Sequence, residues 1–335
     1  MAKINSLPII ILCMAPIFII LTTILSILYG AKNIDFITVW NAFLHYDPEN
    51  VDHAIIITSR LPRVLGALLV GAFLAISGAL MQGMTRNYLA SPSIMGVTDG
   101  SAFVITLCMV FAPGMSSFHM ILFSMLGSAL GAGIVFGFGS LLHNGLSPVR
   151  LAIIGTVIGT FLSSISAAIA SYFQISQSVS FWYNARLHQI NPDILKISIP
   201  IGAIGIILAL VISKSITILS LGDEVSINLG QRTKLVKIVS LLSVVCLTGI
   251  AVALVGKIGF IGLIIPHITR FLIGIDYKWI VPCAGVIGGI FLALCDVISR
   301  FVNYPFETPI GVVTSLIGIP FFLYLIRRKG GEKSV

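Results

Sequence analysis

The chain has 335 residues, of which 57% are hydrophobic and only 10% are charged, and its mean hydropathy is +1.07. Typical soluble domains carry about 25% charged residues, so this composition excludes a soluble enzyme, a secreted scaffold and a nucleic-acid-binding domain. The net charge of +8 instead indicates basic cytoplasmic loops between membrane spans.

Apolar runs separated by polar breaks follow one another along the whole chain. Because a membrane-spanning helix needs about 20 mostly apolar residues, these runs predict an all-α polytopic membrane protein with about ten transmembrane helices. Residues 1–335 then form a single transmembrane domain. The predicted spans are 7–29, 64–84, 93–112, 119–142, 151–172, 195–213, 238–256, 259–274, 280–298 and 310–326.

The first apolar run, from Leu7 to Leu28, is too long for the apolar region of a signal peptide, and no small-residue cleavage site follows it. We therefore interpret it as the first span. The longest polar loop follows at residues 31–59, and its apolar piece from Phe36 to Leu44 predicts an interfacial helix.

An even number of spans places both termini on one side of the membrane. Of the 20 lysine and arginine residues, thirteen fall in loops on the side of the termini and seven, Lys257 among them, on the opposite side. Cytoplasmic loops carry the excess of positive charge, so we expect both termini in the cytoplasm and the chain in the cell membrane.

Glycines recur at four-residue spacing within the apolar runs, a pattern that lets helix backbones approach closely. We expect these pairs to pack inside one subunit, with a pore or dimer contact as the alternative. The pairs are Gly127/Gly131, Gly133/Gly137, Gly155/Gly159 and Gly285/Gly289.

Enzyme motifs are absent from the sequence. It contains no His-Glu-x-x-His and no Gly-x-Ser-x-Gly, and its one Gly-Lys pair, Gly256-Lys257, is followed by Ile258 and lacks the earlier glycine of a P-loop. The five cysteines form no Cys-x-x-Cys pair. We expect no catalytic residue, no cofactor and no metal site, and no ATP binding by this chain.

Two acidic residues lie within apolar runs, where ionisable groups are costly and often functional. Asp99 is either functional or satisfied by a local partner, and Asp296 has Arg300 four residues later, which favours an ion pair. A proton or sodium relay built on both residues would make the protein an ion-coupled secondary transporter, the rival class.

The cytoplasmic loop 214–237 contains signals for a short helix. Asp223 and Glu224 suit its first turn and Gly230 its C′ position. Val225 and Leu229 then lie one turn apart on one face. A helix of two turns is not stable alone, so we expect it to pack against the spans or a partner.

Several segments, taken in order, resemble the iron-siderophore and cobalamin uptake permeases, which are type II ABC importers. Leu219 to Gly230 resembles their coupling loop, and Arg60-Leu61-Pro62-Arg63 resembles part of their second-span signature. The longest match is Gly259-Phe260-Ile261-Gly262-Leu263-Ile264-Ile265-Pro266-His267-Ile268-Thr269-Arg270. In the similar loop Arg86-Asn87-Tyr88-Leu89-Ala90-Ser91-Pro92, Tyr88 replaces the usual proline.

The resemblance implies a permease that passes substrate from an external binding lipoprotein to the cytoplasm, with a second permease subunit and cytoplasmic ATPase subunits as partners. Ferric siderophores are the expected substrates, with haem and cobalamin as alternatives. By position, the resemblance implies ATPase coupling by Leu221, Gly222, Asp223, Glu224, Val225, Leu229 and Gly230, binding-protein docking by Arg60, Arg63 and Arg300, a cytoplasmic gate at Asn87 and Leu89, and a translocation path along Ser163, Ser164, Ser166 and Asp99.

Overall fold

The computed structural model describes residues 6–30, 32–142, 147–184, 187–190, 192–304 and 306–331. Within these residues the secondary structure is helical and contains no strand. The helices are α1 (Leu7–Leu28), α2 (Phe36–Leu44), α3 (Val51–Ile55), the π-helical η1 (Ile56–Arg60), α4 (Leu61–Thr85), α5 (Val97–Phe111), α6 (Ser117–Leu141), α7 (Pro148–Tyr172), α8 (Ser176–Tyr183), the 3₁₀-helical η2 (Leu187–Gln189), α9 (Pro192–Ser220), α10 (Asp223–Asn228), α11 (Thr233–Val255), α12 (Ile261–Ile273), α13 (Tyr277–Ser299) and α14 (Ile310–Gly331).

In the part of the chain that the structure describes, ten apolar helical segments correspond to the ten predicted spans. Seven of them are long and apolar enough to cross a membrane, and the shorter apolar helices Val97–Phe111, Ile261–Ile273 and Ile310–Tyr324 account for the other three. The all-α polytopic fold predicted from the apolar runs is therefore confirmed.

The second span differs most from its predicted bounds. The prediction starts it at residue 64, but a continuous helical segment runs from Val51 to Thr85. The Asn50 side chain accepts hydrogen bonds from the amides of Asp52 and His53, so this polar stretch begins a helix instead of continuing the loop. The predicted interfacial helix is present as α2, where Asp35 caps the amide of Thr38.

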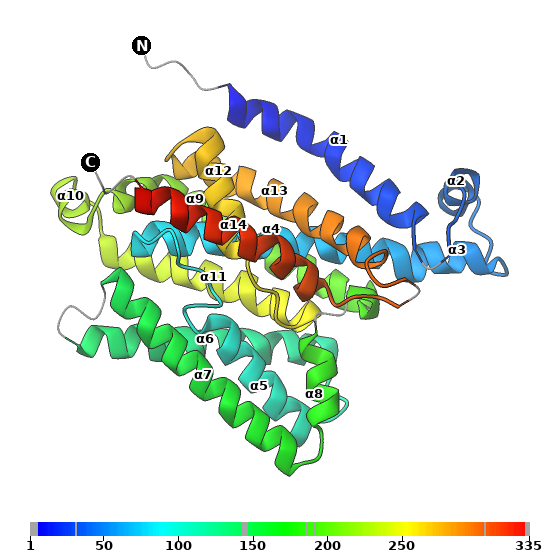
Figure 1. The fold of residues 1–335 in the computed structure, drawn as a ribbon, viewed down its shortest axis with the longest axis horizontal. Helices are drawn as coiled ribbons and strands as arrows, with labels where there is room; N and C mark the ends of the chain where they lie inside the picture. The colour runs from blue at the N-terminus through cyan, green and yellow to red at the C-terminus, as the bar shows by residue number, and fades with distance from the viewer. Residues whose placement is uncertain are drawn as a thin grey trace.

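Helix α4 occupies the centre of the bundle. In Figure 1 it lies among α9, α11 and α13, and α5 to α8 form a group on one side of it. The starting end of α1 and the finishing end of α14 lie at the same end of the molecule as α10, whereas α2 and α3 lie at the opposite end. This arrangement agrees with the predicted placement of both termini on one side.

Glycines set the closest helix contacts. A Cβ atom added at Gly78 of α4 would lie 1.9 Å from the carbonyl oxygen of Gly262 on α12, so only glycine allows this crossing. In the predicted pairs Gly127/Gly131, Gly155/Gly159 and Gly285/Gly289, an added Cβ atom would also lie 3.0 Å or less from an atom of another segment of this chain. The expectation is wrong for Gly133/Gly137, because an added Cβ there would meet no described atom within 4 Å.

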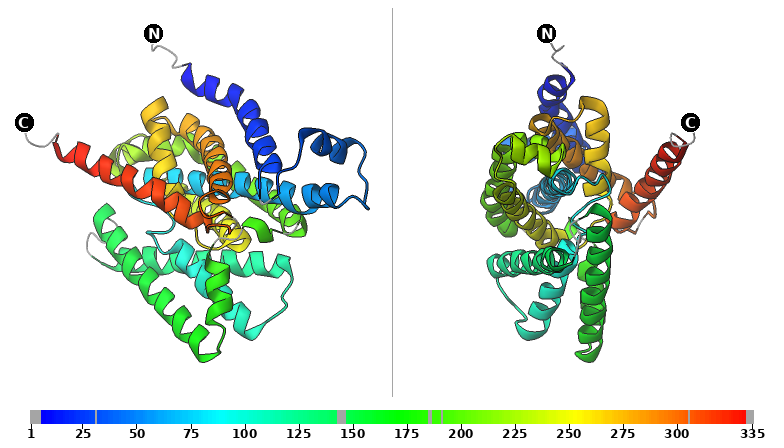
Figure 2. Two further views of the ribbon diagram at one scale, coloured as in Figure 1. Left: turned by 45° about the vertical axis from the view of Figure 1, so that its right-hand side comes forward. Right: turned by 90° about the vertical axis from the view of Figure 1, so that its left-hand side faces the viewer.

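Two helices at the edge of the bundle keep much apolar surface uncovered. Figure 2 shows α7 and α14 extending along different sides of the molecule. Only 22% of the most apolar 18-residue stretch of α7 is buried, against 78% of the corresponding stretch in the segment Val51–Thr85 that contains α4. On α14, Leu316 and Leu323 are exposed. In a membrane such faces are covered by lipid or by another subunit.

Candidate functional site

The short helix α10 has the caps that its sequence predicts. Gly222 precedes it with φ +133°, which side chains rarely adopt, and Gly230 follows its last turn with φ +76°. Asp223 and Glu224 occupy the first turn. The predicted helix is confirmed, and its glycines allow the chain to leave α9, turn and return into α11.

Ser226 anchors α10 against the end of α9. Its buried hydroxyl donates to the carbonyl oxygens of Gly222 (2.7 Å) and Ile218 (3.1 Å). The side chain of Gln231 then donates to the carbonyl oxygen of Ser215 at 2.8 Å. Neither residue was predicted, because a serine and a glutamine in a polar loop carry no signal of such contacts.

The opposite side of α10 presents apolar side chains at the end of the bundle. Val225 is 44% exposed and Leu229 is 64% exposed, and Leu221 before the helix is also exposed. Since Ser226 fixes the backbone from the other side, this face has a defined orientation. It is the kind of surface that a partner protein can cover.

Asp223 connects α10 to two other parts of the chain. Its carboxylate lies 2.9 Å from the ammonium group of Lys237 on α11 and 3.5 Å from the guanidinium group of Arg86, directly after α4. Arg86 has φ +52°, a left-handed conformation that turns the chain from α4 into the next loop. One carboxylate thus bridges α10, α11 and the start of that loop.

The loop after α4 contains the predicted gate residues Asn87 and Leu89. The Asn87 side-chain oxygen accepts a hydrogen bond from the Leu89 amide at 2.9 Å, and the Asn87 amide donates to Gln82 at 3.2 Å. Leu89 is exposed. The Arg270 guanidinium lies 4.4 Å from the ring centroid of Tyr88. This cation–π contact holds the loop at the position where the resembling family has proline.

Arg270 also holds the C-terminal end of α4 in place. It donates to the side chain of Gln82 at 3.1 Å and to the hydroxyl of Tyr277 at 2.9 Å. Gln82 in turn donates to the carbonyl oxygen of Leu263 at 3.1 Å. Helices α4, α12 and α13 are therefore joined next to the gate loop.

Asp99 on α5 has partners from two other parts of the fold. The ammonium group of Lys257 donates to Asp99 Oδ1 at 2.7 Å and to Ser163 Oγ at 3.0 Å. Ser163 on α7 donates to the same carboxylate at 3.1 Å. The Asp99 carboxylate therefore has charged and polar partners within this chain, which is compatible with both roles considered for it. Lys257 was expected in a loop beyond the spans, but its side chain reaches the wall of a groove.

This groove has a volume of about 540 Å³. Its lining residues are Ser93, Ile94, Asp99, Thr156, Gly159, Thr160, Ser163, Ser164 and Ala167. Ser166 does not line it: the residue is buried and its hydroxyl donates to Leu162 within α7. Of the three serines expected on the path, Ser163 and Ser164 line this groove and Ser166 does not.

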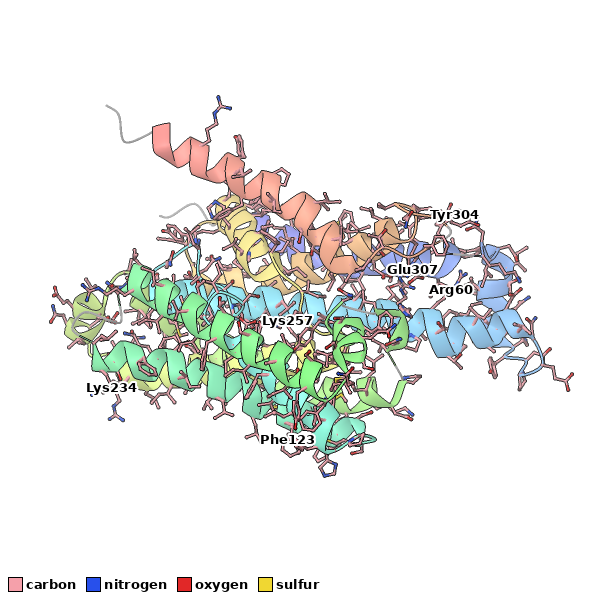
Figure 3. All side chains as sticks on the ribbon, turned by 60° about the horizontal axis from the view of Figure 1, so that its bottom comes forward. Arg60, Phe123, Lys234, Lys257, Tyr304 and Glu307 are labelled. Atoms are coloured by element: carbon pink, nitrogen blue, oxygen red, sulfur yellow. The ribbon has the colours of Figure 1, made fainter. Side chains whose placement is uncertain are left out.

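A second groove has a volume of about 350 Å³. Its lining residues include Tyr183, Lys257 and the first half of α14. Figure 3 shows Lys257 between Lys234 and Glu307 along the length of the molecule. Lys257 thus lines the second groove, while its ammonium group binds Asp99 and Ser163 on the wall of the first.

The three arginines expected at a docking surface are buried, at 8% exposure for Arg60 and Arg63 and 5% for Arg300. Arg60 donates to the carbonyl oxygens of Ile27 and Lys32. Arg60 ends η1, Arg63 lies in the first turn of α4, and Arg300 directly follows α13. Figure 3 labels Arg60 near Glu307. Their burial contradicts the expectation that free guanidinium groups face a partner.

Arg63 and Arg300 share the buried carboxylate of Asp296. Arg63 donates to Asp296 at 2.8 Å and to Glu307 at 2.6 Å. Arg300 donates to Asp296, and to the carbonyl oxygens of Ser26 (2.6 Å) and Tyr29 (2.7 Å). The predicted Asp296–Arg300 pair is confirmed, and the added contacts join α1, α4 and α13.

Glu307 lies between this cluster and the surface. A hydrogen bond from His188, 3.4 Å away, and the nearby Arg63 lower the pKa of Glu307 from 4.5 to about 2, against the opposing effect of burial. The carboxylate is therefore ionised near neutral pH. Among the described residues, no group of three His, Cys, Asp or Glu side chains is placed to hold a metal ion.

Comparisons with known proteins identify the family. The model of the FecCD transport family matches residues 18–328. The chain is 62% identical over 325 residues to the iron-uptake system permease protein FeuB of Bacillus subtilis (strain 168), covering 97% of both chains. It is 52% identical over 305 residues to the iron(3+)-hydroxamate import system permease protein FhuB of the same strain, covering 91% of this chain and 79% of the relative.

The fold has a matching relative of known structure. This is an inward-facing conformation described as a metal-chelate type ABC transporter, with a TM-score of 0.81 and 30% identity over 96% of this chain and 99% of the other. Sequence motifs, helical architecture and both sequence comparisons agree. The chain belongs to the FecCD transport family.

Proposed function

We propose that this chain is the membrane-spanning permease subunit of an ATP-driven importer of iron chelates, with ferric siderophores as substrates. The observation that carries the proposal is the 62% identity, over nearly the full length, to the FeuB permease. The ten apolar helical segments support a multi-pass location in the cell membrane.

The apolar face of α10 is the proposed contact with a cytoplasmic ATPase subunit. Val225 and Leu229 are exposed there while Ser226 fixes the helix from behind. Because α10 lies at the same end as the helical segments that lead to both termini, this end is the proposed cytoplasmic side. Leu221, Gly222, Asp223, Glu224 and Gly230 complete the coupling segment.

The groove beside α7 is the proposed wall of the translocation path. Its hydroxyl groups and the paired charges of Asp99 and Lys257 offer a polar surface without a strong net charge. The groove is open, so a second permease subunit, identical or paralogous, would complete the path. Asn87 and Leu89 lie in the loop proposed to close it on the cytoplasmic side.

The end formed by α2, α3 and the Arg63–Asp296–Arg300 cluster is the proposed docking surface for an external binding protein. Because the guanidinium groups are buried, the arginines would act mainly by holding this surface in shape. Direct contact with carboxylates of the partner requires Arg60, Arg63 and Arg300 to leave their present partners.

Ion pairing disfavours the rival reading of an ion-coupled carrier. Asp99 is paired with Lys257, and Asp296 lies between Arg63 and Arg300. A relay carboxylate must bind and release its ion, and a carboxylate held by adjacent cations does so poorly.

The test is uptake of radioactive iron by cells that lack the chromosomal copy of this permease. Cells that express the chain together with its ATPase and binding protein should accumulate a ferric siderophore, and collapse of the proton gradient with ATP maintained should not stop uptake. Uptake that requires the proton gradient but no ATPase would overturn the proposal. Parallel assays with haem and cobalamin test the alternative substrates.

A further inference from the structure

The ion pair of Asp99 and Lys257 lies on the wall of the proposed path. Asp99 lines the groove beside α7, and Lys257 lines the groove beside α14. The two side chains remain 19% and 26% exposed, unlike the fully packed Asp296 at 1%. A chelate that moves along this wall therefore meets both charges at the same level.

The surrounding residues fix the pair in place. Ser163 bonds to both partners, and Lys257 lies 4.9 Å from the ring centroid of Tyr183. The Tyr183 hydroxyl is 2.7 Å from that of Thr106. A Cβ atom at Gly159 would lie 2.5 Å from Asp99 Oδ2, so glycine at this position leaves room for the carboxylate.

Resting on the proposed function, we propose that Asp99 and Lys257 together determine the charge selectivity of the translocation path. As a pair they leave the wall neutral, so a charged chelate passes without being retained or repelled. In a path with low-dielectric walls, a single uncompensated charge acts strongly on a charged substrate. The discrimination between charged and neutral chelates thus depends on whether both residues are present, because each residue neutralises the charge of the other.

The chemistry of iron chelates makes this testable. A ferric tris-catecholate is strongly anionic, because each catecholate contributes two negative charges, whereas a ferric tris-hydroxamate of a neutral backbone has no net charge. An unpaired Asp99 should repel the catecholate complex, and an unpaired Lys257 should retain it. The passage of the neutral complex should change much less in both cases.

The experiment measures uptake of both radioiron chelates by reconstituted transporter. Each chelate is delivered by a binding protein that binds this chelate and docks with the transporter. Lys257→Met should lower the ratio of anionic to neutral uptake about tenfold, which corresponds to about 1.4 kcal/mol. Asp99→Asn should lower both the half-saturating concentration and the maximal rate much more for the anionic chelate than for the neutral one. The double variant Asp99→Asn/Lys257→Met should restore the ratio to within about twofold of the unchanged protein.

Matched controls separate charge selectivity from stability. Lys196→Met removes a lysine from an exposed pair with Asp193 on α9 and should leave the ratio unchanged, as should Lys257→Arg, which keeps the positive charge. All rates are normalised to the amount of assembled transporter. If Lys257→Met does not accumulate, the Asp99→Asn and double variants, which leave no unpaired carboxylate, decide the question.

Two outcomes would overturn the inference. One is an equal loss of both chelates in each single variant, and the other is a double variant as selective as either single variant. The first outcome describes a pair that only stabilises the fold, and the second describes a selectivity that does not come from charge compensation between the two residues. Both leave uptake by the unchanged protein intact. Absence of uptake by the unchanged protein would instead overturn the proposed function, and the charge selectivity with it.

Discussion

Arg86 lies directly before the predicted gate residue Asn87, and its guanidinium group is 3.5 Å from the carboxylate of Asp223 at the start of α10. The same carboxylate is 2.9 Å from Lys237 on α11. The segment proposed to contact the ATPase is thus joined by one side chain to the loop proposed to close the path. Movement of α10 would change the position of that loop through this contact.

Replacement of Asp223 by asparagine should therefore weaken coupling without preventing assembly. Each partly exposed ion pair contributes about 0–1 kcal/mol, so we expect a loss of roughly two- to fivefold in substrate-stimulated ATP hydrolysis. Asp193→Asn, which removes the carboxylate of an exposed pair within α9, is the matched control. Stimulated hydrolysis equal to that of the unchanged complex would contradict a coupling role for Asp223.

Charge on the apolar face of α10 should have a larger effect. Val225→Asp with Leu229→Asp should abolish substrate-stimulated hydrolysis, because burial of unpaired carboxylates in the partner contact is strongly unfavourable. The permease should remain in the membrane, since both side chains are exposed in the isolated chain. Val225→Ala with Leu229→Ala should reduce stimulation only in part. Copurification of the ATPase reports assembly, and normal assembly with normal transport would move the contact elsewhere.

The buried Arg63–Asp296–Arg300 cluster, at the end of the molecule opposite α10, predicts the order in which substitutions lower the free energy of unfolding. Asp296→Asn leaves Arg63 and Arg300 without their shared carboxylate and should cost about 3–5 kcal/mol. Arg63→Met should cost less, because Arg300 still pairs with Asp296. Lys196→Met on the exposed pair should cost at most about 1 kcal/mol. Thermal unfolding in detergent measures the order, and a smaller loss for Asp296→Asn than for Arg63→Met would refute it.

Glu307 should make the stability of this end depend on pH. Its pKa is lowered from 4.5 to about 2 in the folded state, so its stabilising contribution is fully present above pH 4.5 and is lost as the pH falls toward 2. The shift corresponds to about 3 kcal/mol, which we reduce to about 1 kcal/mol because the side chain is 36% exposed.

The comparison of Glu307→Gln with the unchanged protein measures this contribution. The variant should be less stable near pH 6, and the difference should shrink steeply toward pH 2, where the carboxyl group of the folded unchanged protein is about half neutral. Glu49→Gln, in the exposed segment before α3, serves as the control. A difference that stays constant from pH 6 to pH 2 would exclude ionisation of Glu307 as its cause.

Gly78→Ala should separate α4 from α12, because the added methyl group would lie 1.9 Å from the carbonyl oxygen of Gly262. Overpacking of this kind costs about 1–3 kcal/mol, and both helices flank the gate loop. Gly133→Ala on α6 meets no described atom within 4 Å and should be neutral or slightly stabilising. The unfolding temperature and the transport rate should therefore fall for Gly78→Ala, and neither should fall for Gly133→Ala.

Features that depend on neighbours within a few residues could be predicted from the sequence. The apolar runs gave the spans, since transfer of apolar side chains from water does not depend on which helix lies beside them. Asp223 and Gly230 gave the limits of α10, because caps act on the backbone of the same turn. The pair of Asp296 and Arg300 followed from their spacing along one helix.

Features that depend on how helices pack were decided only by the tertiary structure. Lys257 and Asp99 are 158 residues apart, and nothing local to either residue indicates the other. Arg63 could be read from the sequence as a span-end cation, but its burial requires Asp296 and Glu307, more than 200 residues away, to neutralise it. Whether a charge faces a partner, a path or another helix is fixed by side-chain pairing across the bundle, because a charge in a low-dielectric interior is stable only with an opposite charge beside it.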